Sequence, residues 1–180
     1  MRKLGRKLTS ALLTLALLVS LLPIGAAPAQ AAGEGDTGVF TVTGGKLGTD
    51  YAYSGPDPSE PGGAGVLTVK TSTELTISTN NATESPANGR IVIENGVTAN
   101  ITLAGLSIKP ADSSTSDGCS GIDLGSGATL DITLQSGSSN VINGGISSTD
   151  GTPAPGIHVP EGSTLTIDGN GSLEVNGAYD

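Results

Sequence analysis

Short apolar-x-apolar segments, separated by polar turns, recur along the chain after residue 32. Three segments align on a central glycine, with apolar residues five and three positions before it and three and five positions after it: Ile91–Ile101 on Gly96, Ile122–Ile132 on Gly127, and Ile157–Ile167 on Gly162. Only Ala99 is small among these apolar positions. An earlier copy, Leu67–Ile77, has Ser72 where the glycine stands. Alternation with period two predicts strands that bury one face.

The three copies with a central glycine each continue into a further short apolar segment, at Leu106–Ile108, near Val141, and at Leu173–Val175. A unit of three short strands with glycine-containing corners is typical of one rung of a parallel β-helix. We therefore expect an all-β fold, a right-handed parallel β-helix of about four rungs. A β-sandwich also has short alternating strands, but it would not repeat one register around a fixed glycine.

Stacked rungs place equivalent side chains above one another at intervals of roughly 4.8 Å. The alignment therefore predicts two neighbouring columns of buried side chains. One contains Ile101, Ile132 and Ile167, and the other contains Leu130 and Leu165.

The N-terminal segment has the composition of a secretory signal peptide. A basic stretch precedes the uncharged apolar run Ala11–Leu22, and small residues follow at Ala29 and Ala31. The run is shorter than the ~20 residues that a membrane-spanning helix needs. We expect residues 1–31 to be removed, residues 32–180 to form the β-helix domain, and no membrane span to remain. Because the last strand ends just before Asp180, we expect this domain to be truncated at its C-terminus.

The charge balance excludes one class of partner. After signal removal, four basic residues face 17 acidic ones; the basic residues are Lys46, Lys70, Arg90 and Lys109. Nucleic-acid binding needs cations that replace the condensed counterions of the phosphate backbone, so we expect no nucleic-acid partner. The single cysteine, Cys119, cannot form an intramolecular disulfide.

The spacing between copies is longer than one core rung. The additional residues form four polar insertions at the same position in the repeat: Gly48–Ala64, Thr79–Gly89, Pro110–Ser120 and Gly145–Pro155. Insertions at one phase of a solenoid emerge along one edge, which is often the binding surface. The candidate ligand-binding residues there are Tyr51, Tyr53, Asp57, Glu60, Asp112, Asp117 and Asp150. The tyrosines form a sugar platform in one interpretation and pack over the end of the solenoid in the other. The carboxylates are either solvated or ligands for Ca²⁺, which prefers oxygen donors, but no D-x-D-x-D-G loop is present.

Residues typical of catalysis are sparse. His158 alternates with apolar neighbours and so points outward, without a nucleophile motif beside it. Arg90 and Lys109 are isolated cations in the repeats, and Asp123 and Asp131 are outward-facing carboxylates. A glycosidase needs two opposed carboxylates, and the sequence alone does not pair them. We therefore predict a protein that is not an enzyme.

Three segments resemble a known group of proteins: Gly38–Gly45, Gly65–Ile77 and Val159–Leu173. They are similar to large surface proteins of Gram-positive bacteria, described as carbohydrate-binding-domain-like or adhesin-like parallel β-helices. The resemblance covers most of residues 38–177 and rests on structural rung residues. It implies a secreted, cell-wall-associated protein, and no catalytic residue of such proteins maps onto this chain.

These observations give one leading hypothesis and two alternatives. The leading hypothesis is a non-catalytic extracellular carbohydrate-binding or adhesion module, whose partner is a polysaccharide or cell-surface glycan. A purely structural spacer of a cell-wall protein is the first alternative. A fragment of a β-helix polysaccharide lyase is the second.

Overall fold

The computed structural model describes residues 37–55, 65–79, 86–111, 119–147 and 149–178. This part of the chain contains strands and no helix, which confirms the predicted all-β class. The strands are β1 (Phe40–Thr43), β2 (Tyr51–Ser54), β3 (Gly65–Val69), β4 (Leu75–Thr79), β5 (Gly89–Ile93), β6 (Thr98–Leu103), β7 (Ser107–Ile108), β8 (Ile122–Leu124), β9 (Thr129–Leu134), β10 (Ser139–Asn143), β11 (Ile157–His158), β12 (Thr164–Gly169) and β13 (Ser172–Asn176). The predicted signal peptide lies outside the described residues.

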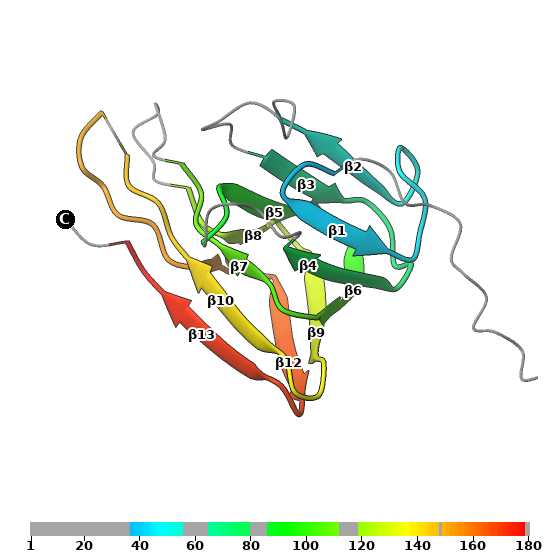
Figure 1. Ribbon diagram of the computed structural model, residues 1–180. Helices are drawn as coiled ribbons and strands as arrows, with labels where there is room; N and C mark the ends of the chain where they lie inside the picture. The colour runs from blue at the N-terminus through cyan, green and yellow to red at the C-terminus, as the bar shows by residue number, and fades with distance from the viewer. Residues whose placement is uncertain (1–36, 56–64, 80–85, 112–118, 148, 179–180) are drawn as a thin grey trace, which may run out of the picture. The chain divides into compact units, whose positions relative to one another are not determined.

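The strands form three sheets (Figure 1). Sheet A has the order β1-β4-β6-β9-β12, sheet B the order β11-β8-β5-β3-β2, and sheet C the order β13-β10-β7. From β5 onward, successive strands join sheets B, A and C in that order, three times over. All pairs among these strands are parallel. The predicted unit of three short strands is therefore present.

The two ends of the sheets differ. At one end, β1 pairs antiparallel with β4, and β2 pairs antiparallel with β3. At the other end, β11, β12 and β13 are the last strands of their sheets. Figure 1 shows β12 and β13 far from β1 and β2. Antiparallel strands thus cover the first end, and parallel strands form the last.

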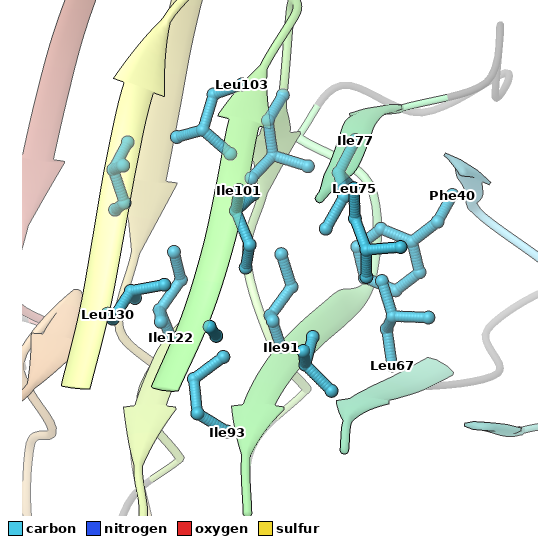
Figure 2. Packing of buried hydrophobic residues seen from close by; sticks show 14 of the residues in the cluster. Phe40, Leu67, Leu75, Ile77, Ile91, Ile93, Ile101, Leu103, Ile122 and Leu130 are labelled. Atoms are coloured by element: carbon cyan, nitrogen blue, oxygen red, sulfur yellow. The ribbon is translucent and has the colours of Figure 1, made fainter. Parts of the chain in front are cut away.

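The inward faces of the three sheets contribute to one apolar cluster. It contains Ile91 of β5, Ile101 of β6 and Ile108 of β7, which belong to sheets B, A and C respectively. Figure 2 shows side chains from β5, β6 and β9 directed into the same interior, Leu130 among them. Every second residue of β3 and β5 is buried, as period-two patterning requires.

The predicted pairing within the columns is confirmed where three full copies stack, but Ile167 is 44% exposed and not buried as predicted. Ile101 pairs with Ile132, which pairs with Ile167, and Leu130 pairs with Leu165. The central glycines Gly96, Gly127 and Gly162 have φ values of 70°, 69° and 79°. A β-carbon is disfavoured in this left-handed region, so the turn between strands requires glycine.

The earliest copy departs from the predicted register. The alignment on Ser72 places Ile77 opposite Ile101, but the structure pairs Leu75 with Ile101 and Ile77 with Leu103. The preceding strands, β3 and β5, follow the alignment, since Leu67 pairs with Ile91. Measured between paired residues, the connection from β3 to β4 is therefore two residues shorter than the connection from β5 to β6. A shift of two residues keeps the same side chains on the inward face, and so the pattern alone did not reveal it.

Sheet C contains a buried polar residue that the sequence pattern missed. A strand near Val141 was predicted, and β10 is that strand, but its inward residues are Asn140 and Ile142. Asn140 lies in register with Leu173, and its side chain is fully hydrogen-bonded. Its Oδ1 accepts from the N–H groups of Gly105 (3.0 Å) and Leu106 (2.9 Å), and its Nδ2 donates to Ser138 Oγ and Ser172 O (both 3.0 Å).

Parts of two predicted insertions belong to the sheets. Gly48–Ala64 contains the whole of β2. In Thr79–Gly89, Ala87 is buried and forms a parallel bridge with Ile108 of sheet C. Ala87 therefore continues the column of Ile108, and the insertion is shorter than predicted. In the described residues, no helix is long and apolar enough to cross a membrane.

The columns make a matched pair of substitutions informative. Ile132 is 2% exposed, whereas Ile167, in the same column, is 44% exposed. Ile132→Asp buries an unpaired charge and should cost at least about 4 kcal/mol, enough to abolish folding. Ile167→Asp should cost much less, because its side chain reaches solvent. Circular dichroism during thermal unfolding measures both, and equal effects would contradict the stacking register.

A second prediction concerns Asn140. Asn140→Leu should lower the free energy of unfolding by about 2 kcal/mol or more, although it adds an apolar residue to an apolar column. Each buried backbone group that loses its partner costs about 1–3 kcal/mol. Asn143→Leu, on the half-buried outward side of β10, is the control: it should cost less, because it removes one bond to a backbone group, that of Nδ2 to Ile108 O, whereas Asn140→Leu removes three. Urea titration measures both variants, and a stabilised Asn140→Leu protein would refute the role of these hydrogen bonds.

Candidate functional site

An arginine, an aspartate and a histidine meet on the outward face of sheet B. Arg90 of β5 donates from Nη2 to Asp123 Oδ2 of β8 at 2.9 Å. His158 Nδ1 of β11 lies 2.8 Å from Asp123 Oδ1. One carboxylate therefore uses both oxygens, one toward a guanidinium and one toward an imidazole. We call Arg90, Asp123 and His158 the sheet B cluster.

Strand register brings the cluster together. The inward residues Ile91, Ile122 and Ile157 lie in one column, so their sequence neighbours point outward. His158 is directly opposite Asp123 in the ladder. Arg90 precedes Ile91, so its long side chain reaches diagonally across to Asp123. Neighbouring strands lie about 4.8 Å apart, which suits such contacts.

Cys119 lies beside the cluster. Arg90 Nη1 donates to its Sγ at 3.4 Å. The Nε of Arg90 is buried, and it has no hydrogen-bond partner among the described residues. The guanidinium is thus held in place by a thiol and a carboxylate, while His158 is the most exposed member. The positions of Arg90 and Asp123 are consequently fixed, and the outer part of the cluster faces solvent.

The cluster lies where the predicted insertions return to sheet B. Arg90 directly follows Thr79–Gly89, Asp123 closely follows Pro110–Ser120, and His158 closely follows Gly145–Pro155. The ends of the last two insertions contact each other, because Gly145 N–H donates to Cys119 O at 2.8 Å. That the four insertions share one edge stays a prediction, because most residues of the first three lie outside the described residues.

The residues predicted for ligand binding lie in different surroundings. Tyr51 lies in β2 and is fully buried in the core, so its ring is not an exposed sugar platform. Tyr53 is partly buried and packs edge-on against Phe40, with ring centroids 6.4 Å apart. Both tyrosines instead fit the alternative of packing over the end of the sheets, because β2 is the last strand of sheet B. Asp57, Glu60, Asp112 and Asp117 lie outside the described residues.

Asp150 lies in a closed turn. Ile146 and Pro153 form an antiparallel bridge around it, and Asp150 Oδ1 accepts from the N–H of Thr152 at 3.0 Å. Hydrogen bonding from the Ser147 side chain, and then from Thr152, holds the pKa of the Asp150 carboxyl below its usual value. This carboxylate therefore orders its own loop.

The sequence did not reveal the cluster because it presents the three residues as isolated. In the sequence, His158 has no nucleophile motif beside it and Arg90 is an isolated cation, yet both contact Asp123. The repeat alignment itself contained the relevant clue, since Asp123 and His158 occupy the same position relative to Gly127 and Gly162. The alignment does not show that the Arg90 side chain extends diagonally to Asp123.

The chemistry of the cluster suits recognition. It presents the cationic guanidinium of Arg90, the imidazole of His158 and the carboxylate of Asp123 on one sheet face, and such groups bind hydroxyls and carboxylates. A two-carboxylate glycosidase arrangement requires a second acid, and Asp123 is the one carboxylate in the cluster. Among the described residues, no group of three or more histidine, cysteine, aspartate or glutamate side chains could hold a metal ion.

No protein-family model, curated protein or solved structure matches the chain.

The Asp150 turn predicts a pH effect. A carboxyl whose pKa is lowered on folding stabilises the turn above its unfolded pKa of about 3.9, and that stabilisation is lost as the pH falls through the lower folded value. Ser147→Ala should move the pKa of Asp150 back toward the unfolded value. NMR titration of the carboxyl carbon measures this shift. An unchanged pKa in Ser147→Ala would mean that Ser147 is not the cause.

Proposed function

We propose that the protein is an exported, non-catalytic binding module whose residues 32–180 form a right-handed parallel β-helix of about four rungs. The recurring order of sheets B, A and C and the parallel register support a coiled path, since each circuit returns the chain beside its previous strand. The basic and apolar composition of residues 1–31 supports export.

The ligand in this proposal is a polysaccharide or another cell-surface glycan. The observation that carries the proposal is the sheet B cluster, where Arg90, Asp123 and His158 converge at the ends of the insertions. Sugar hydroxyls donate and accept hydrogen bonds, so a carboxylate flanked by a guanidinium and an imidazole complements them. On an acidic glycan, the guanidinium of Arg90 would pair with ligand carboxylates.

The other two functions are less well supported. A spacer needs only the core, and nothing in the core requires the convergence of Arg90, Asp123 and His158. Partly exposed ion pairs typically contribute about 0–1 kcal/mol, so stability gives little reason for this cluster. A lyase would need a free base, whereas the guanidinium of Arg90 is engaged by Asp123.

A glycan array with and without Ca²⁺ tests the proposal. The wild-type chain should bind one class of glycan, and Asp123→Asn should weaken that binding about tenfold or more, because loss of the charge releases Arg90 and His158. The control is Asp131→Asn, the same chemical change on the outward side of β9 in sheet A. It should leave binding unchanged, and both variants should keep the wild-type melting temperature within a few degrees.

Three outcomes would contradict the proposal. Absence of any glycan binding by the wild-type chain would favour the spacer. Equal binding by Asp123→Asn and wild type would place the ligand on another surface. Shortening of a bound polysaccharide during incubation, with unsaturated ends detected by their ultraviolet absorbance, would show an enzyme.

A further inference from the structure

The sheet B cluster belongs to a longer row of side chains. One position on each strand of sheet B lies opposite the same position on the next strand, and these residues are Ala52 (β2), Thr68 (β3), Val92 (β5), Asp123 (β8) and His158 (β11). Their neighbours within the strands belong to the apolar core or pack against it, so the five residues lie on the outward face. We call them the sheet B row.

The row runs across the strands and is long. Neighbouring strands lie about 4.8 Å apart, so the four steps from β2 to β11 cover roughly 19 Å. A pyranose ring is much shorter than this distance. A glycan that contacts the whole row must therefore contain several sugar units, joined in a direction perpendicular to the strands.

The site is narrow in the other direction, along the strands. The residues two positions before and after Asp123 are Gly121 and Gly125. A β-carbon on Gly121 would lie 2.6 Å from the carbonyl oxygen of Asn143, and one on Gly125 would lie 2.5 Å from Asn95 Oδ1. Close packing thus excludes larger side chains at both positions. The functional groups of the site extend from strand to strand instead.

Polar and apolar groups alternate along the row. Asp123 and His158 form its hydrogen-bonded polar part. Val92 and Ala52 are half-buried and present methyl groups, and Thr68 between them adds a hydroxyl, which can donate and accept hydrogen bonds. Pyranose units carry the same two kinds of surface, because hydroxyls surround the ring and C–H groups cover its faces. A chain of such units complements the row along its length.

We propose that the ligand is a linear, extended polysaccharide that lies along the sheet B row, with one unit at the cluster and further units over Val92 and Thr68. This inference rests on the glycan-binding function proposed above, and it specifies the class of glycan and its direction on the protein. The row is continuous with the cluster, so a chain bound at Asp123 and extended across the strands passes over β5 and β3. A terminal sugar of a branched glycan would use the cluster alone.

Sheet A contains a comparable row that serves as a control surface. Thr76 of β4 is opposite Thr102 of β6, which is opposite Thr133 of β9. Thr102 is half-buried and outward-facing, as Thr68 is in sheet B. The strands of sheet A contain no arginine, lysine or histidine. A ligand that needs both the cluster and the row should therefore bind sheet B and not sheet A.

A series of oligosaccharides of increasing length tests the proposal by isothermal titration calorimetry on the full chain. The probes are linear 1,4-linked oligomers of glucose, of N-acetylglucosamine and of galacturonic acid, each from the monomer to the hexamer. In the series that binds, the affinity should rise by about tenfold or more between monomer and tetramer, because each added unit contacts a further strand. Equal affinities for monomer and tetramer would overturn the proposal.

A substitution on β3 tests the direction of the chain. Thr68→Gln obstructs the unit over β3 without a change of charge, so it should lower the affinity for the tetramer about fivefold and leave that for the dimer unchanged. Thr102→Gln is the matched control and should bind both oligomers as wild type does. An effect of Thr102→Gln, or none of Thr68→Gln, would overturn the placement. If Thr68→Gln does not fold by circular dichroism, the length series decides.

Failure of this inference is distinguishable from failure of the proposed function. If no glycan binds the wild-type chain, both are overturned. If a glycan binds and Asp123→Asn weakens that binding, but the tetramer binds no better than the monomer, only the linear chain along the row is overturned. A gain with length that Thr68→Gln removes and Thr102→Gln retains would support both.

Discussion

The parallel hydrogen-bond ladder between equivalent strands is the constraint on which the rest of the structure depends. Because β6, β9 and β12 pair position for position, each inward side chain of one strand must pack against the inward side chain at the same position of the next strand. Burial of a large aliphatic side chain contributes roughly 1.5–3 kcal/mol, and the buried neighbours Ile101 and Ile132 repeat that gain in successive circuits. The same ladder compels outward residues to stack as well. The core and the surface cluster are therefore two consequences of one register.

This constraint explains two departures from the simple pattern. Where the connection to sheet C lengthens before β10, the inward position falls on Asn140, and the buried amide bonds backbone groups on both neighbouring circuits. Where the connection from β3 to β4 shortens, the pairing slides by two residues and stays on the same face. The ladder tolerates changes at corners as long as the inward face remains filled.

The sequence predicted the strands and the stacking because both follow from period-two patterning around Gly96, Gly127 and Gly162. It could not predict the slip at Leu75, because both registers bury the same residues. The repeat alignment places Tyr51 in a polar insertion, because the segment around it has no counterpart in the other copies that would show an antiparallel edge strand. The Arg90 contact was also hidden, because a diagonal reach depends on side-chain conformation and not on alignment.

The most direct test of the account is the detection of individual backbone hydrogen bonds between circuits by NMR scalar couplings. The structure places the Thr129 N–H on the Val97 carbonyl, and the Thr164 N–H on the Ala128 carbonyl, each at 2.9 Å. The account predicts a coupling across both bonds, which join residues far apart in the sequence through the same repeat position. Couplings from these amides to carbonyls within their own copy of the repeat, as in a series of hairpins, would contradict it.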